Sequence, residues 1–118
     1  FGKRISEFQG MQFKIADMVT ELIAARTMTR LAASKIDSND SEATVYSAMA
    51  KRFATDVGFN VCNEALQIFG GYGYIQEYPL ERHVRDVRVH QILEGTNEIM
   101  KMIIGRRMIM EDAASIIQ

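Results

Sequence analysis

Helix-breaking, disulfide-forming and membrane-anchoring features are scarce in this sequence. Proline occurs once among 118 residues, tryptophan does not occur, and the single cysteine is Cys62. One cysteine cannot form a disulfide within the chain or complete a zinc site, and no apolar run approaches the roughly 18 residues of a membrane-spanning helix. We therefore exclude a disulfide scaffold, a zinc finger and a membrane span, and we expect a soluble protein in a reducing compartment.

An excess of one charge is missing as well. The chain carries 14 Lys and Arg residues against 15 Asp and Glu residues, so its formal net charge is -1. A chain with this balance has no bulk electrostatic attraction to nucleic acid or to an anionic membrane. Its 47% hydrophobic and 25% charged residues are typical of a globular domain, which excludes disorder as the main state.

Chain length and the first residues bear on domain organisation. The 118 residues suffice for one compact domain, but not for a cofactor-binding enzyme of several domains. The chain begins at Phe1, and residues 1–4 lack the apolar core of a secretory signal, so we interpret this end as a cut end. We expect one domain of a larger protein.

Eight methionines and a single proline favour helices. Apolar residues recur at steps of three and four through two long segments, which predicts helices over 4–36 and 41–69. The first stripe contains Phe8, Met11, Ile15, Met18, Leu22 and Ala25, and the second contains Tyr46, Met49, Phe53, Val57, Val61, Ala65 and Ile68. The two helices are predicted to pair as an antiparallel hairpin.

Charged residues fall between the apolar positions of both predicted helices. We predict that they face solvent. They are Glu7, Lys14, Asp17, Glu21, Arg26, Arg30, Lys51, Arg52, Asp56 and Glu64. In the polar turn between the helices, Asn39 and Glu42 have the spacing of a capping box for the second helix.

A glycine cluster predicts where the second helix ends. Gly70 and Gly71 permit a backbone with positive φ, which is the usual way to terminate a helix. Pro79 suits the first turn of a short helix over 79–90, and apolar residues at 99, 100, 103 and 104 predict a last helix over 96–112. The predicted fold class is all-α, an antiparallel four-helix bundle.

One acidic residue stands out between the last two predicted helices. Glu94 follows the apolar pair Ile92 and Leu93 and directly precedes Gly95. We expect its carboxylate to be partly desolvated, which would make it a stronger proton acceptor near neutral pH. An acid next to a helix end also serves as a cap or a salt-bridge partner, so this pattern by itself leaves both interpretations open.

Several motifs occur together at a fixed spacing. They are Gln67–Tyr74, Glu77–Pro79, Arg85–Asp86 and Glu94–Glu98, with Phe1–Lys3 and Gln9 near the start. In wording and spacing these segments resemble the carboxyl-terminal domain of the acyl-CoA dehydrogenases, and the resemblance extends over essentially the whole chain. Gly71–Tyr74 and Val89–Gly95 look closest to the isobutyryl-CoA branch of that family, and Leu93 stands where many straight-chain members have tyrosine.

The resemblance implies an FAD-dependent enzyme that introduces an α,β double bond into a short or branched acyl-CoA thioester. In the family, the acid matching Glu94 is the catalytic base that removes the α-proton, and its backbone N–H polarises the thioester carbonyl while the β-hydrogen leaves as hydride to the flavin. Gly95 matches a position where the acyl chain approaches the base. Positions close to FAD match Phe1, Gln9, Gln67, Ile68, Phe69, Gly70, Gly71, Thr96, Asn97 and Glu98.

The resemblance also implies a larger subunit and partners. The family's full subunit contains an amino-terminal helical domain and a middle β domain, so residues 1–118 are expected to be one C-terminal domain that is inactive alone. Electron-transfer flavoprotein is the implied electron acceptor, and a homodimer or homotetramer is the implied assembly. The implied location is the mitochondrial matrix in a eukaryote, or the cytoplasm in a bacterium.

Three other functions compete with this interpretation. A metal-binding bundle needs Glu-x-x-His pairs, which the sequence lacks, and Asp86 with His90 alone makes no site. A group of basic residues suggests nucleic-acid binding. Acidic residues interrupt this group, however, and no aromatic residues alternate with it, which argues against such binding. That group is Arg82, His83, Arg85, Arg88 and His90. A non-catalytic dimerisation module of the same fold remains the alternative, although the intact Glu94–Thr96 motif argues against it. We expect no metal, nucleic-acid or membrane partner.

Overall fold

The structure, a computed structural model, describes residues 2–110 and residue 116. A short 3-10 turn, η1, covers Ile5–Glu7, and the helices are α1 (Gln9–Asp37), α2 (Ala43–Phe69), α3 (Gly71–Tyr74), α4 (Leu80–Val89) and α5 (Asn97–Met110). The described residues contain no β-strand, so the predicted all-α class is confirmed. Phe1 and the last two residues of the predicted helix over 96–112 lie outside the described residues.

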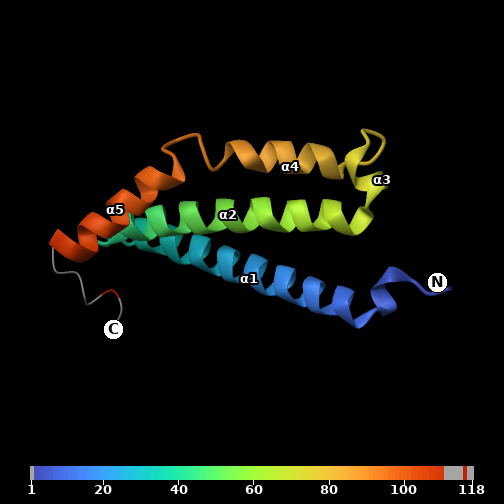
Figure 1. Cartoon of the computed structure of the whole chain (residues 1–118). Helices are drawn as coiled ribbons and strands as arrows, with labels where there is room; N and C mark the ends of the chain where they lie inside the picture. The colour runs from blue at the N-terminus through green and yellow to red at the C-terminus, as the bar shows by residue number, and fades with distance from the viewer. Residues whose placement is uncertain (1, 111–115, 117–118) are drawn as a thin grey trace.

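Helix α2 lies in the centre of the molecule (Figure 1). It packs antiparallel to α1 on one side, and it contacts α4 and α5 on the other side. The molecule measures 58 × 28 × 25 Å. It is elongated because α1, at 1.5 Å per residue, is about 44 Å long. The helices α1, α2, α4 and α5 confirm the predicted antiparallel four-helix architecture.

Small and β-branched side chains fill the core around α2. The buried apolar residues are Ala25, Ala32, Val45, Ala48, Ala50 and Val57. Two of them on α1 and two on α2 are seven residues apart, the spacing of long helices that pack at a shallow angle. Between Val45 and Leu66 only Asn60 and Asn63 are exposed, because α2 has neighbours on both sides.

Only part of the predicted stripe of α1 faces the core. Met11, Met18 and Ala25 are buried or half-buried, as predicted. The stripe residues that do not reach the core are Phe8, Ile15 and Leu22, which are 41%, 43% and 40% exposed. The prediction is wrong for these three because α1 packs chiefly against α2, and a single neighbouring helix covers only a narrow strip.

Helix α1 begins at Gln9 rather than at residue 4. Phe8 has an extended backbone, with φ of -84° and ψ of 127°, and separates α1 from η1. The Glu7 carboxylate accepts a hydrogen bond from the Arg4 N–H at 3.2 Å and closes this separate turn. Apolar periodicity could not reveal the break, because a 3-10 turn has nearly the same number of residues per turn as an α-helix.

The turn between α1 and α2 differs from the predicted capping box. Asn39 has a left-handed backbone with φ of 52°, and no side chain caps the start of α2. Instead, Asp40 accepts hydrogen bonds from the Glu42 N–H at 2.8 Å and from the Lys35 Nζ at 2.7 Å. The hydrogen bond from Lys35 holds the pKa of Asp40 below its ordinary value. The capping-box prediction is wrong because asparagine, which tolerates the left-handed region, reverses the chain here.

The other helix ends lie close to their predicted positions. Helix α2 ends at Phe69, because Gly70 adopts φ of 59° and ψ of -136°, a conformation open mainly to glycine. The glycine cluster continues as α3, a single turn that periodicity does not predict. The predicted helices over 79–90 and 96–112 correspond to α4 and α5.

Half of the charged residues predicted to face solvent do so. The exposed ones are Glu7, Asp17, Glu21, Arg26 and Arg30. The prediction is wrong for Lys14, Lys51, Arg52, Asp56 and Glu64, which are half-buried. Four of these five lie on α2, whose central position leaves it almost no solvent-facing side. Lys14 of α1 forms an ion pair with Glu64 of α2 across the interface.

Candidate active site

The loop that carries Glu94 is closed by backbone hydrogen bonds at both ends. The N–H groups of Ile92 and Leu93 both donate to the Val89 carbonyl at 2.9 Å, which ends α4 in a tight turn. The Asn97 N–H donates to the Gln91 carbonyl at 3.0 Å and brings the start of α5 back to the end of α4. These bonds fix the length and direction of the loop over residues 90–96.

Glu94 occupies an unusual backbone conformation at the tip of this loop. Its φ is 54°, and Gly95 follows with φ of 91°. The left-handed region costs a residue other than glycine roughly 1–2 kcal/mol, so other contacts must hold Glu94 there. Within residues 2–110, the Glu94 N–H donates to no protein acceptor.

The Glu94 side chain is exposed on this domain. The expected desolvation is not provided by its neighbours, because Ile92 is itself 52% exposed and Leu93 only half-buried. Glu94 is therefore open to a molecule that approaches from outside the domain, and its backbone N–H has no partner within residues 2–110. Any desolvation of this acid has to come from that molecule or from further protein.

Lys51 of α2 is hydrogen-bonded to the loop and to the start of α5. Its Nζ donates to the Gly95 carbonyl at 2.7 Å and to Asn97 Oδ1 at 2.8 Å. Asn97 is 4% exposed and is the buried polar residue of the described core. A buried amide of this kind must be fully hydrogen-bonded to be tolerated.

Asp56, five residues further along α2 than Lys51, completes the same network. Its Oδ1 accepts hydrogen bonds from Asn97 Nδ2 and from Gln91 Nε2, both at 2.7 Å. The Thr55 hydroxyl bonds Asn97 as well, at 2.9 Å from Nδ2. The sequence pattern did not predict this role, because Lys51 and Asp56 were expected to face solvent. The available signal is that the polar residues Lys51 and Thr55 are four residues apart, so that they lie on the same side of the helix.

Thr96 and Glu98 shape the first turn of α5. The Thr96 hydroxyl accepts a hydrogen bond from the Ile99 N–H at 3.4 Å. Hydrogen bonds from its own backbone and from the Thr96 hydroxyl lower the pKa of the Glu98 carboxyl. Negative charge in this position is also favoured by the amino-terminal end of the helix dipole. Glu98 is thus an exposed acceptor beside the Glu94 loop.

The glycine segment forms a second group of candidate residues. A Cβ atom placed on Gly70 or Gly71 would meet nothing within 4 Å, so their exposed backbone is open to close approach. Gln67 and Phe69 are exposed beside them, and Ile68 is half-buried. The centroids of the Phe69 and Tyr78 rings lie 6.5 Å apart in an edge-to-face contact. This contact packs the glycine segment against the residues that precede α4.

The two groups lie at different ends of α4. Gln9, the exposed first residue of α1, lies at the end of the molecule where α2 passes into α3 (Figure 1). The Glu94 loop follows the opposite end of α4, whose ten residues span about 15 Å. The structure thus brings Glu94 together with Gly95, Thr96, Asn97 and Glu98, but it does not place Gln67–Gly71 against them.

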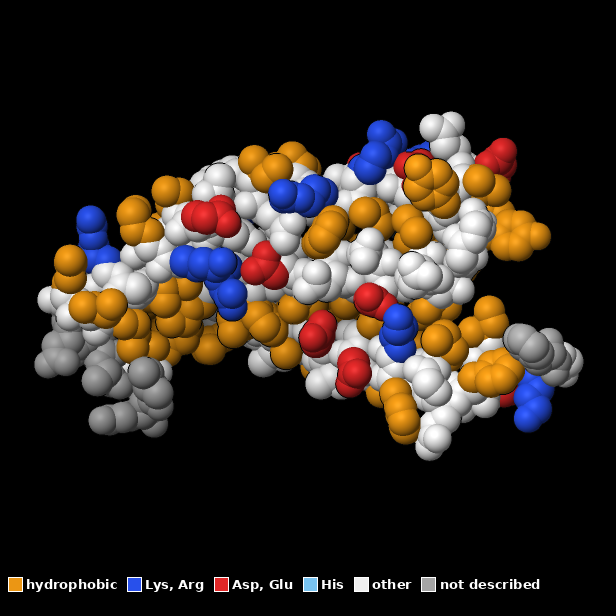
Figure 2. Space-filling view, in the orientation of Figure 1, with side chains coloured by type: hydrophobic (Ala, Val, Ile, Leu, Met, Phe, Trp, Pro, Cys, Tyr) orange, Lys and Arg blue, Asp and Glu red, His pale blue; other side chains and the backbone are white. Residues whose placement is uncertain are grey.

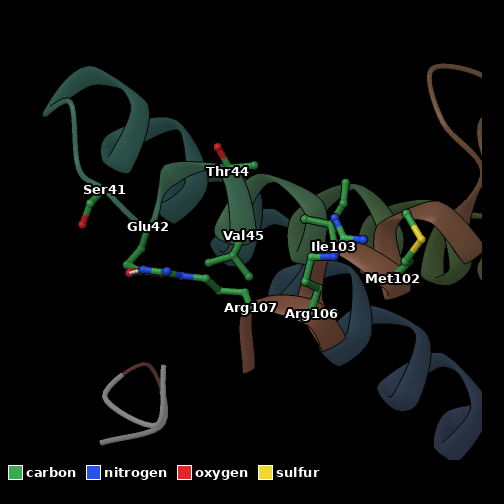
Figure 3. Close-up of a pocket in the computed structure, with 8 residues that line it drawn as sticks. All are labelled: Ser41, Glu42, Thr44, Val45, Met102, Ile103, Arg106 and Arg107. Atoms are coloured by element: carbon green, nitrogen blue, oxygen red, sulfur yellow. Dashed lines mark hydrogen bonds and ion pairs between the residues drawn. The ribbon is translucent and has the colours of Figure 1, made fainter. Parts of the chain in front are cut away.

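A pocket of about 530 Å³ lies between the start of α2 and the second half of α5 (Figure 3). Its walls include the ion pair between Glu42 and Arg107, and the hydrogen bond from Arg107 lowers the pKa of Glu42. The other lining residues are Ser41, Thr44, Val45, Met102, Ile103 and Arg106. None of the sequence-predicted site residues lines this pocket, so it is not the candidate active site.

Other chemistries find little support in the described part of the chain. Within residues 2–110 and 116, no three His, Cys, Asp or Glu side chains are placed to hold a metal ion. The same residues include no helix long and apolar enough to cross a membrane. Burial raises the pKa of the Cys62 thiol, which disfavours the nucleophilic thiolate. The basic residues of α4 and His90, which follows the helix, are all exposed, and Arg85 pairs with Glu81 of its own helix.

Comparisons with known proteins show which family this chain resembles. The family described as "Acyl-CoA dehydrogenase, C-terminal domain" matches residues 1–109. The mitochondrial isobutyryl-CoA dehydrogenase of Dictyostelium discoideum is 51% identical over 112 residues, which cover 95% of this chain and 27% of that protein. Subunit CarC of the caffeyl-CoA reductase-Etf complex of Acetobacterium woodii is 49% identical over 105 residues, 89% of this chain and 27% of that protein.

A solved structure agrees with these sequence matches. Butyryl-CoA dehydrogenase from Megasphaera elsdenii superposes with a TM-score of 0.88 at 47% identity, over 92% of this chain and 28% of that one. The chain thus spans little more than a quarter of the length of its relatives, 27% to 28%. By its family match, its identity to these relatives and its shared architecture, the chain belongs to the acyl-CoA dehydrogenase family, in which it corresponds to the C-terminal helical domain.

Proposed function

We propose that the full protein is an FAD-dependent acyl-CoA dehydrogenase that acts on a short or branched acyl-CoA thioester. The observation that carries this proposal is the exposed Glu94, held in a left-handed backbone with its N–H unpaired in the described chain and followed by Gly95. The relative named isobutyryl-CoA dehydrogenase, at 51% identity, favours a branched four-carbon substrate.

In the proposed reaction, Glu94 acts as the general base. Its carboxylate removes the α-proton of the thioester, and the electrons of that C–H bond form the new Cα=Cβ double bond. The Glu94 N–H donates to the thioester carbonyl oxygen, where negative charge develops as the proton leaves. Gly95 offers no side chain to obstruct the acyl chain. When bound, FAD accepts the β-hydrogen as hydride.

The exposed residues suit a flavin nucleotide. The open backbone at Gly71 offers an N–H donor that a pyrophosphate can approach, whereas the Gly70 N–H donates to the Gln67 carbonyl at 3.0 Å. The side-chain amide of Gln67 offers both a donor and an acceptor. We propose that Phe1, Gln9, Gln67, Ile68, Phe69, Gly70, Gly71, Thr96, Asn97 and Glu98 hold the cofactor. Asn97 contributes to this cofactor site through its backbone or by supporting the loop, because its side-chain amide is hydrogen-bonded to Lys51, Thr55 and Asp56.

Two copies of the chain are needed under this proposal. The glycine segment and the Glu94 loop lie at different ends of α4, which supports a cofactor site shared between subunits of a homodimer or homotetramer. The exposed apolar side chains along α1 support the same conclusion, since large apolar areas normally meet protein. They include Ile5, Phe8, Phe13, Ile15, Val19, Leu22, Ile23, Leu31 and Ile36.

The remaining parts of the proposal concern the rest of the enzyme. We propose that an amino-terminal helical domain and a middle β domain complete the subunit, and that electron-transfer flavoprotein accepts the electrons. The relative named as a subunit of a reductase-Etf complex supports that acceptor. A mitochondrial matrix location in a eukaryote, or a cytoplasmic one in a bacterium, follows from the relative named as mitochondrial and from the bacterial relatives.

The deciding experiment replaces Glu94 with glutamine in the full-length enzyme. Glu94→Gln keeps the shape of the side chain but removes its basicity, so flavin reduction by isobutyryl-CoA in anaerobic stopped flow should slow by about 10²- to 10⁴-fold. FAD content and acyl-CoA binding should stay unchanged.

A Glu77→Gln variant is the matched control, because Glu77 is an exposed loop glutamate that is not among the proposed site residues. A Glu94→Gln enzyme that reduces its flavin within tenfold of the parent rate would remove Glu94 from the mechanism. A parent enzyme that binds no FAD and oxidises no acyl-CoA would favour the second candidate, a non-catalytic helical dimerisation module of the same fold.

A further inference from the structure

We infer that Lys51 and Asp56 of α2 are positioning residues for Glu94, which they hold in its reactive backbone conformation through Gly95 and Asn97. The inference rests on the proposed function of Glu94 and adds the groups on which its geometry depends. Neither residue belongs to the motifs of the chain's second half, and both were expected to face solvent.

The first step of the argument is the contact between Lys51 and the loop backbone. The Lys51 Nζ lies 2.7 Å from the Gly95 carbonyl oxygen, directly after the peptide unit that joins Glu94 to Gly95. A carbonyl held at this point restricts rotation of the backbone that carries Glu94. The hydrogen bond has a charged donor and is therefore among the stronger kinds.

The second step is the buried amide of Asn97. Lys51 bonds its Oδ1 at 2.8 Å, and Asp56 bonds its Nδ2 at 2.7 Å. The opposite charges of Lys51 and Asp56 thus fix both the position and the orientation of this amide. Because Asp56 also accepts from Gln91 at 2.7 Å, the two ends of the loop are attached to one carboxylate.

The third step concerns the helix that carries these groups. Helix α2 contacts α1, α3, α4 and α5, so it is the most firmly supported element of the domain. Glu94, by contrast, is exposed and has a positive φ. A non-glycine residue stays in that region only when its surroundings determine the conformation. The described hydrogen bonds from α2 to the loop and to Asn97 come from the side chains of Lys51, Thr55 and Asp56 and from the Arg52 carbonyl.

The functional consequence follows from the geometry of proton transfer. A general base must lie within hydrogen-bonding reach of the proton that it removes. A displacement of 1 Å caused by a distant residue can slow a reaction by about 10²-fold. Loss of Lys51 should therefore slow proton removal far more than it weakens the binding of FAD or substrate.

The test uses the full-length holoenzyme with isobutyryl-CoA and butyryl-CoA as substrates. Lys51→Met removes the ammonium but keeps most of the side-chain volume, and Lys51→Arg restores a charged donor. We expect the rate constant for flavin reduction to fall roughly 10- to 100-fold in Lys51→Met and to recover in part in Lys51→Arg. Lys14→Met is the matched control, because Lys14 is a half-buried interhelical lysine that pairs with Glu64 and does not touch the loop.

Two further readouts separate positioning from general support of the fold. The kinetic isotope effect with α-deuterated substrate should rise in Lys51→Met, while the dissociation constant for acyl-CoA changes far less than the rate constant for flavin reduction. Hydrogen exchange of peptides that cover residues 90–97 should become faster in Lys51→Met but not in Lys14→Met. Exchange in α1 and α2 should stay unchanged in both variants.

A Lys51→Met holoenzyme that reduces its flavin within twofold of the parent would overturn the inference. If Lys51→Met fails to bind FAD, Asp56→Asn decides by the same criterion, because it keeps the shape of the carboxylate and removes its charge. Glu94→Gln is measured in parallel. A fully active Glu94→Gln enzyme would refute the proposed function, whereas an inactive Glu94→Gln enzyme beside an unaffected Lys51→Met enzyme would refute positioning alone.

Discussion

Glu94 and Gly95 form a pair in which two successive residues have positive φ, 54° and 91°. Glu94 carries the reactive carboxylate, and its left-handed backbone is unfavourable in free energy because it has a Cβ atom. The second avoids that cost because it has no Cβ atom. A Cβ on Gly95 would also lie 2.8 Å from the Met100 Cε atom, although the flexible end of Met100 can move aside.

At this residue scale we predict that Gly95→Ala destabilises the domain by roughly 1–2 kcal/mol, the cost of the left-handed region for alanine. The change should be visible in urea unfolding of the full-length enzyme. Flavin reduction should slow as well, because relaxation of the Gly95 backbone would move Glu94.

Gly105→Ala is the matched control for this variant. Gly105 lies within α5 at an ordinary φ, and a Cβ there meets nothing within 4 Å. Alanine should stabilise the helix at that position by about 0.5–1 kcal/mol. Equal stabilities of Gly95→Ala and Gly105→Ala would show that the positive φ at Gly95 carries no strain.

At the scale of the elements, the position of α2 explains most of what the periodicity of the sequence did not predict. A helix with neighbours on two sides has no face left for charged residues, so its polar side chains bind other parts of the chain. Lys51 and Asp56 bind the Glu94 loop, and Glu64 pairs with Lys14 of α1. Each of these contacts joins residues that are far apart in the sequence.

A second consequence at this scale is a pH dependence of the contact between α5 and the start of α2. The hydrogen bond from Arg107 lowers the pKa of Glu42, so the pair contributes stability above the ordinary glutamate pKa and loses it as the pH falls through the lowered value. Glu42→Gln should therefore unfold at a lower temperature than the parent at neutral pH. The difference should shrink in acid, where Glu42 of the parent is protonated.

Thermal unfolding of both proteins between neutral and acidic pH measures this effect. Glu81→Gln serves as the control, because its partner Arg85 is 73% exposed, whereas Arg107 is 31% exposed, and solvent around a partner weakens an ion pair. A Glu42→Gln variant whose deficit is the same at every pH would refute the ion pair as its cause.

For the whole molecule, the main feature is the apolar surface that no part of the described chain covers. Hydrophobic side chains reach the surface along α1 and near α3 (Figure 2). Phe13, Ile23 and Ile36, for example, are 61%, 55% and 57% exposed. An apolar surface on this scale normally contacts another domain or subunit.

We predict that residues 1–118 produced alone fold into a mainly helical domain, associate with themselves and have no dehydrogenase activity. Circular dichroism measures the helical content, and sedimentation velocity measures the self-association. FAD should not copurify in stoichiometric amount, because under the proposed function much of the flavin site lies in other domains and in the neighbouring subunit. A monomer that carries one FAD would contradict this prediction, and so would a chain without helical structure.

The sequence by itself determined the helical class, the main helix boundaries after residue 41 and the loop position of Glu94. These depend on local features: apolar residues at steps of three and four, the glycine at position 70, and Pro79 before α4. Local patterns also carried the resemblance to the family, since its motifs are short runs such as Glu94–Glu98.

Only the tertiary structure decided which helix lies in the centre and what its charged residues bind. Nothing in the local pattern distinguishes Lys51, which supports the loop, from Arg26, which faces solvent, because both lie off an apolar stripe. The difference arises because α4 and α5 fold back onto one side of α2 but leave the outer side of α1 uncovered. Long-range packing therefore made polar residues of α2 into structural contacts and left apolar residues of α1 at the surface.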